Sequence, residues 1–153
     1  MINSTSFVSS PIPSITGWRP SEITASCKSF PVEGAVKDRR LHPMDCMDIV
    51  VGTVHGDGRS RVGDYYTRDR STPQPDSFYG GADDLSGAEG WVSDGNTHVM
   101  FRKKARKNGA GDHDFAGRMT FIWAHGRSDD AFYAPNELKY HGGSGRGVGS
   151  IGA

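Results

Sequence analysis

The run DIVVGTV at residues 48–54 limits most strongly what this chain can fold into. It is rich in β-branched residues and too short for a good helix, so it predicts a β-strand. Residues 56–58, Gly-Asp-Gly, tolerate positive φ, and VGDYYT at residues 62–67 returns as a second extended segment. The sequence therefore predicts a β-hairpin at this point.

Further short extended segments follow the hairpin. Residues 91–92 and 97–102 flank a turn, and RMTFIWA at residues 118–124 is the most convincing strand, expected in the middle of a sheet. The connection over residues 71–90 is rich in Pro, Asp and Gly, with a short strand expected around Phe78. With 21 Gly, 8 Pro and only 35% hydrophobic residues, the composition favours an all-β fold over a helical bundle.

The first 41 residues are rich in Ser, Pro and Thr and have neither a period of two nor one of 3.6. We therefore expect an irregular segment over residues 1–41 and an ordered domain over residues 42–153. Cys27 and Cys46 are the two cysteines, which fits either one disulfide in an oxidising compartment or two free thiols.

Charge excludes several partner classes. The 18 basic and 18 acidic residues give a formal net charge of zero, which removes the global electrostatic argument for nucleic acid or an anionic membrane as a partner. The basic run RKKARK at residues 102–107 is interpreted as a solvated strand edge. No stretch approaches the roughly 20 apolar residues of a membrane span, and the N-terminus has no signal-peptide pattern.

Candidate chemistry is sparse. Asp112-His113-Asp114 offers metal ligands but lacks the spacing of a known metal motif, so a turn whose Asp side chains cap backbone amides is favoured. Neither a nucleophile elbow nor a recognisable pair of carboxylates is present, so we expect no catalytic site of the chain's own.

Met44 and His141 are the remaining candidates. Met44 precedes the first strong strand, and His141 follows the last strand region, with Tyr140 before it and glycines after it. A thioether and an imidazole are the axial pair of haem iron in electron-transfer cytochromes. The alternative is that Met44 simply fills a gap in the core.

The order of the segments resembles that of the DOMON domain, most closely the animal proteins that join DM13 and DOMON modules, the Skeletor- and Knickkopf-like group. The similarity covers roughly residues 42–151. The segments that carry it, in chain order, are residues 44–52, 62–66, 75–76, 101–103, 112–114, 121–126, 140–142 and 146–147.

This resemblance implies an immunoglobulin-like β-sandwich in an extracellular or secretory setting. Because residues 1–41 have no alternating pattern, the sandwich is expected to lack its first strands. Haem-binding members use a Met and a His, which correspond to Met44 and His141 here, and Arg146 would pair with a propionate. The glycines after His141 would let the backbone run close beneath the macrocycle.

The function that follows is a haem-b-binding, one-electron-transfer module of a matrix- or cuticle-associated protein. Its expected partners are other domains of a longer parent protein and extracellular matrix, chitin or another carbohydrate. The alternative is a haem-free carbohydrate-binding or protein-interaction module. That alternative needs exposed aromatic residues, for which the candidates are Tyr65, Tyr66, Phe78, Tyr79 and Trp91.

Overall fold

The computed structural model describes residues 7–9, 14–20, 42–106, 109, 111–126 and 138–151. These residues form strands, turns and one short 3₁₀ helix, η2 (Asp76–Tyr79). The strands are β1 (Phe7–Ser9), β2 (Ser14–Pro20), β3 (Met47–Val54), β4 (Ser60–Thr67), β5 (Gln74–Pro75), β6 (Ser86–Ser93), β7 (Asn96–Arg102), β8 (Met119–His125) and β9 (Arg146–Ile151). The predicted all-β class is confirmed.

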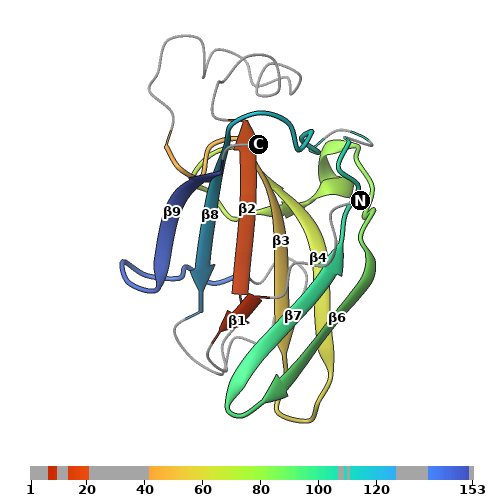
Figure 1. Cartoon of the computed structure of the whole chain (residues 1–153), viewed down its shortest axis with the longest axis vertical. Helices are drawn as coiled ribbons and strands as arrows, with labels where there is room; N and C mark the ends of the chain where they lie inside the picture. Colours follow the sequence, from red (N-terminus) through yellow and green to blue (C-terminus); the bar gives the residue numbers. More distant parts are fainter. Residues whose placement is uncertain are drawn as a thin grey trace.

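Two antiparallel sheets make up the fold (Figure 1). The larger sheet has the order β5-β4-β3-β2-β8-β9, and the smaller has the order β1-β7-β6. The β6–β7 hairpin packs across β3 and β4 of the larger sheet. The expected interior position of β8 is confirmed, because it pairs with β2 on one side and β9 on the other.

Both predicted hairpins form. β3 pairs with β4 along its whole length, from Met47↔Thr67 to Val54↔Ser60. β6 and β7 are joined by a two-residue turn, in which Asp94 and Gly95 have φ of 52° and 74°. Such a turn matches the right-handed twist of the strands. The short strand expected around Phe78 is wrong, since Phe78 lies in η2.

The expectation of an irregular N-terminal segment and a sandwich without its first strands is wrong for residues 7–9 and 14–20. β2 lies between β3 and β8, with Gly17 opposite both Ile49 and Ile122. A Cβ on Gly17 would lie 2.7 Å from Ile49 Cγ1, so this central strand needs a glycine. Glycine weakens a strand pattern in sequence, which explains why β2 did not show as one.

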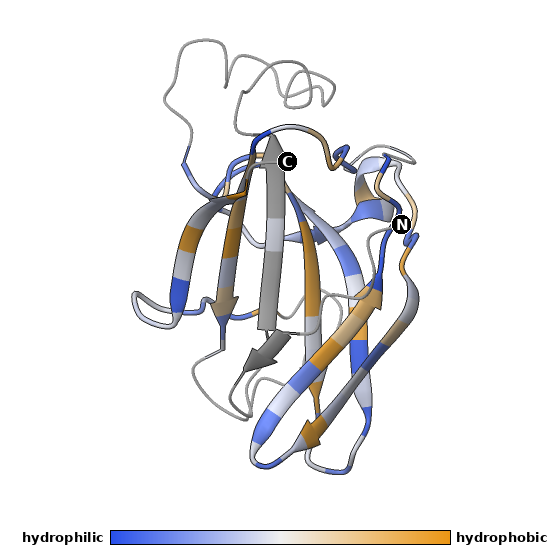
Figure 2. Cartoon of the chain, in the orientation of Figure 1, coloured by the Kyte–Doolittle hydropathy of each residue, from blue (hydrophilic) through white to orange (hydrophobic). Residues whose placement is uncertain are grey.

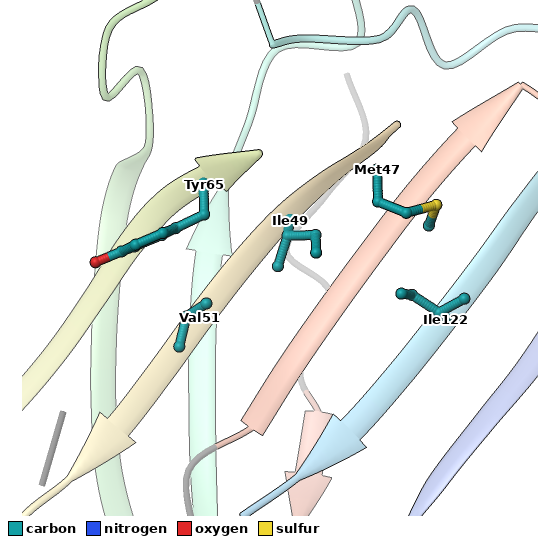
Figure 3. Packing of buried hydrophobic residues seen from close by; sticks show 5 residues of the cluster. All are labelled: Met47, Ile49, Val51, Tyr65 and Ile122. Atoms are coloured by element: carbon teal, nitrogen blue, oxygen red, sulfur yellow. The ribbon is translucent and has the colours of Figure 1, made fainter. Parts of the chain in front are cut away.

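Each face of the larger sheet carries its own apolar cluster, and apolar colours run along β3, β7 and β8 in Figure 2. One cluster faces away from the smaller sheet and contains Met47, Ile49, Val51, Tyr65 and Ile122 (Figure 3). The other packs against the smaller sheet and contains Val50, Val99, Phe101 and Met119. Alternation along β3 sends Ile49 and Val50 to opposite faces, so one strand serves both clusters.

Cys46 is disulfide-bonded, and Cys27 is the only other cysteine of the sequence. Of the two alternatives left open by the sequence, a free thiol is excluded for Cys46, and Cys27 lies outside the described residues. Cys46 ends the turn before β3 and has a φ of 59°, unusual for a residue with a Cβ. The helical segment within the described residues is only four residues long, and none there could cross a membrane.

Candidate functional site

A cavity of about 750 Å³ lies on the face of the larger sheet that points away from β6 and β7. Its volume falls within the roughly 300–1,000 Å³ typical of sites for small molecules and cofactors. Ile49, Ile122, Ala124 and Leu138 supply apolar lining. Met44, His141 and Arg146 all line it too, so the structure brings the three predicted site residues together around one cavity.

Met44 is positioned by the turn before β3. The Thr67 hydroxyl on β4 donates a hydrogen bond to the carbonyl of Met44, and the amide of Met47 donates to the same hydroxyl oxygen at 3.2 Å. The amide of His42 donates to Asp45 Oδ2 at 2.9 Å, which closes the turn. The Met44 side chain is half-buried and packs against the cluster around Met47. Its thioether therefore lies between core and cavity.

His141 is 8% exposed, and its Nδ1 is buried without a hydrogen-bond partner in the described part of the chain. A buried polar atom without a partner is rare enough to need an explanation. Burial lowers the pKa of His141, the charges of Arg146 and His125 lower it further, and a backbone contact with Gly142 opposes them. The imidazole is therefore neutral near pH 7, the form that binds a metal.

Cationic side chains line the cavity as well. Arg70, Lys139 and Arg146 contribute to its lining, whereas the lining residues in the described ranges include no Asp or Glu. An apolar lining with cations suits a flat hydrophobic molecule that carries anionic groups. The sequence pointed to Arg146 alone, because Arg70 and Lys139 lie outside the strands and no motif marks them.

The glycines after His141 have a role that the sequence did not indicate. A Cβ on Gly145 would lie 2.3 Å from His125 Nε2, and one on Gly147 would lie 2.4 Å from Trp123 Nε1. These glycines make room for ring side chains of β8. Gly147 also lines the cavity, so the expected close approach to a ligand stays a prediction for that residue.

A second polar site lies on the opposite face of the β3–β4 hairpin. Lys103 Nζ is 2.8 Å from Asp48 Oδ1, 2.7 Å from Asp64 Oδ1 and 2.7 Å from Asp112 Oδ1. His113 belongs to the same group, since its backbone amide donates to Asp48 Oδ2 at 3.1 Å. All five of these residues are buried.

Two sequence interpretations are corrected by this cluster. The basic run at residues 102–107 is not wholly a solvated edge, because Lys103 is buried. The turn at residues 112–114 does more than cap backbone amides, because Asp112 is buried and pairs with Lys103. One signal was available: Val99 and Phe101 point inward from β7, and the same period of two places Lys103 inward.

The model of the DOMON domain matches residues 40–126, more than half of the chain. The chain belongs to the DOMON family. No curated protein and no solved structure matches it. DOMON domains are binding or electron-transfer modules known for haem and sugar ligands, and they are typically extracellular. The matched range includes Met44 and Lys103, whereas His141 and Arg146 follow it.

Proposed function

We propose that this DOMON domain binds haem b in the cavity between Met44 and His141 and carries single electrons. The observation that supports the proposal best is the imidazole of His141. It is buried, has no hydrogen-bond partner at Nδ1 among the described residues, and lines the same cavity as Met44.

The lining residues fit such a ligand. Met44 and neutral His141 would hold the haem iron through a thioether and an imidazole, and haem would supply a one-electron iron couple there. Arg146, Arg70 and Lys139 would bind the two propionates, with each guanidinium able to hold a carboxylate through two hydrogen bonds. Ile49 and Ile122 would exclude water from the ring.

Titration of the purified protein with haemin tests this function. We expect a saturable Soret shift at one equivalent and, after reduction, the sharp α and β bands of a six-coordinate low-spin haem. Met44→Ala and His141→Ala should each lose the low-spin spectrum. Met100→Ala and His98→Ala are matched controls on β7, outside the cavity, and should keep it. An unchanged spectrum in the first two variants would exclude the proposed ligands.

A haem-free carbohydrate-binding module is the second candidate. Of the aromatic residues it needs, Tyr65 and Tyr66 are buried, whereas Phe78 is 70% exposed and Trp91 38%. Trp91 stacks on His98 with ring centroids 5.2 Å apart, which leaves its outer face open to a sugar ring. Retention on chitin or another glycan that is lost in Trp91→Ala and kept in His141→Ala would favour this candidate.

The biological setting belongs to the proposal as well. The disulfide of Cys46 supports an oxidising compartment, in keeping with a secreted matrix- or cuticle-associated protein. Membership of the Skeletor-like group, and other domains of a longer parent protein as partners, are inferred from the order of the sequence segments. Secretion of the parent protein and its extraction with the matrix fraction would test this setting.

A further inference from the structure

We propose that Asp64, Asp84 and Asp112 bind one calcium ion beside Lys103, with Asp76 completing the acidic wall of the site. The site lies on the face of the β3–β4 hairpin opposite the cavity of Met44 and His141, so it is independent of the proposed haem function.

The geometry of three carboxylates suits one cation. Asp64, Asp84 and Asp112 each offer an oxygen, and these three atoms lie within 4.8 Å of one another. Calcium binds oxygens at roughly 2.3–2.6 Å, so two ligands on opposite sides of the ion are about 4.6–5.2 Å apart. All three oxygens can therefore reach the same ion.

Lys103 does not satisfy the whole cluster. Its ammonium has three hydrogens, and Asp48, Asp64 and Asp112 lie at 2.7–2.8 Å from Nζ. Asp84 Oδ1 is 3.8 Å away, beyond hydrogen-bonding distance, and both of its buried carboxylate oxygens are without a hydrogen-bond partner in the described ranges. Lys103 contacts Asp64 and Asp112 through their Oδ1 atoms, and the backbone amide of Asp84 donates to Asp64 Oδ2 at 3.5 Å.

Asp76 gives a second, independent indication of a ligand. It is 1% exposed, and neither carboxylate oxygen has a hydrogen-bond partner within the described residues. The loop that carries Asp112 approaches it closely, since a Cβ on Gly111 would lie 2.7 Å from Asp76 Oδ2. A cation beside Asp76 would compensate the charge of its buried carboxylate.

The donor chemistry selects the ion. The site offers only oxygen atoms, which favours hard cations such as calcium and magnesium. When they are ionised, five carboxylates around one ammonium leave an excess of negative charge, which a divalent ion reduces. The ligands come from β4 and from irregular segments before β6 and after β7, and calcium tolerates such irregular geometry better than magnesium, which demands a near-ideal octahedron.

Calcium chloride added to protein freed of metal by EDTA tests the site without any haem. We expect a saturable rise in the melting temperature, roughly 5–10 °C at a calcium concentration 100 times the dissociation constant. Calorimetric titration should give one ion per chain. Magnesium chloride should give a smaller shift. Absence of any saturable effect of calcium up to about 10 mM, above the range of extracellular calcium modules, would overturn the proposal.

Matched variants locate the ion. Asp84→Asn and Asp76→Asn keep the size of the side chain and should each lose most of the calcium-dependent shift. Asp94→Asn changes an exposed acid in the β6–β7 turn, where Asn also tolerates positive φ, and should retain the full shift. If calcium stabilises the Asp84→Asn protein as much as the unaltered one, the ion binds elsewhere and the assignment is wrong.

Discussion

At the scale of single residues, Lys103 is a buried cation that compensates several buried carboxylates. Its Nζ lies within 2.8 Å of three carboxylates, and its side chain is 3% exposed. The desolvation cost of a buried ion pair means that such a group is poor evidence for net stability. Removing one partner is different, because the remaining charges then stay buried without compensation.

Lys103→Met should therefore destabilise the protein by about 3–5 kcal/mol at pH 7. The loss should shrink as the pH falls, since burial raises the pKa of Asp48 and Asp64 and protonation removes their uncompensated charges. Urea unfolding at pH 5 and pH 7 measures both effects. Lys104→Met, at the exposed neighbouring position, should change stability by less than about 0.5 kcal/mol. Equal losses in the two variants would contradict the assigned role.

Sequence reasoning found the cavity residues and missed the ionic cluster, for physical reasons. Met44 lies in the segment that matches the family, in the turn before β3, whereas His141 follows that segment and precedes β9. The members of the cluster come from β3, β4, η2 and two loops, and nothing in their spacing shows that these segments converge. An aspartate such as Asp48 inside an apolar run was the available hint that a buried partner existed.

At the scale of elements, β2 decides whether the larger sheet is one piece. It is the only strand between β3 and β8 in the sheet order. A Cβ on Gly17 would meet the side chains of both Ile49 and Ile122, which lie on either side of the β2 ribbon in Figure 3. The hairpins were predictable because their strands are β-branched and their turns contain glycine. β2 was not predictable, because the need for glycine at position 17 comes from Ile49 and Ile122, which are distant in sequence.

Gly17→Ala should destabilise the fold by about 1–3 kcal/mol, because the new methyl group overpacks the contact with Ile49. Thermal or urea unfolding measures the change. Gly149→Ala is the control on the edge strand β9, where an added Cβ meets nothing within 4 Å, and it should be neutral or slightly stabilising. If Gly17→Ala is as well tolerated as Gly149→Ala, β2 does not occupy the centre of the sheet.

At the scale of the whole molecule, a formal net charge of zero conceals an uneven distribution. Cations line the cavity on one face of the larger sheet, and buried carboxylates gather on the other. Burial raises the pKa of Asp48 to about 8, of Asp64 to about 7 and of Asp76 to about 8. The ammonium of Lys103 opposes this rise in all three, and neighbouring carboxylates add to it.

Stability in EDTA should therefore fall as the pH rises from 5 to 8. The folded state keeps protons that the unfolded chain releases near pH 4, which costs about 1.4 kcal/mol per pH unit for each retained proton. His141 acts in the opposite sense: burial lowers its pKa, so the unfolded chain takes up a proton first as the pH falls below about 6.5. Because three carboxyl groups lower the stability as the pH rises and one histidine raises it, the net result should be a fall in stability.

Urea midpoints at pH 5, 6, 7 and 8 measure the pH dependence. A change in midpoint reports a change in stability where the slope of free energy against urea concentration stays the same. Asp76→Asn removes one of the three carboxyl groups and should make the fall shallower, whereas Asp94→Asn at the exposed turn should not change it. A midpoint that rises from pH 5 to pH 8 would mean that the carboxylates are charged throughout and satisfied by other means. The rise in stability with pH would then come from His141, whose lowered pKa acts in that direction.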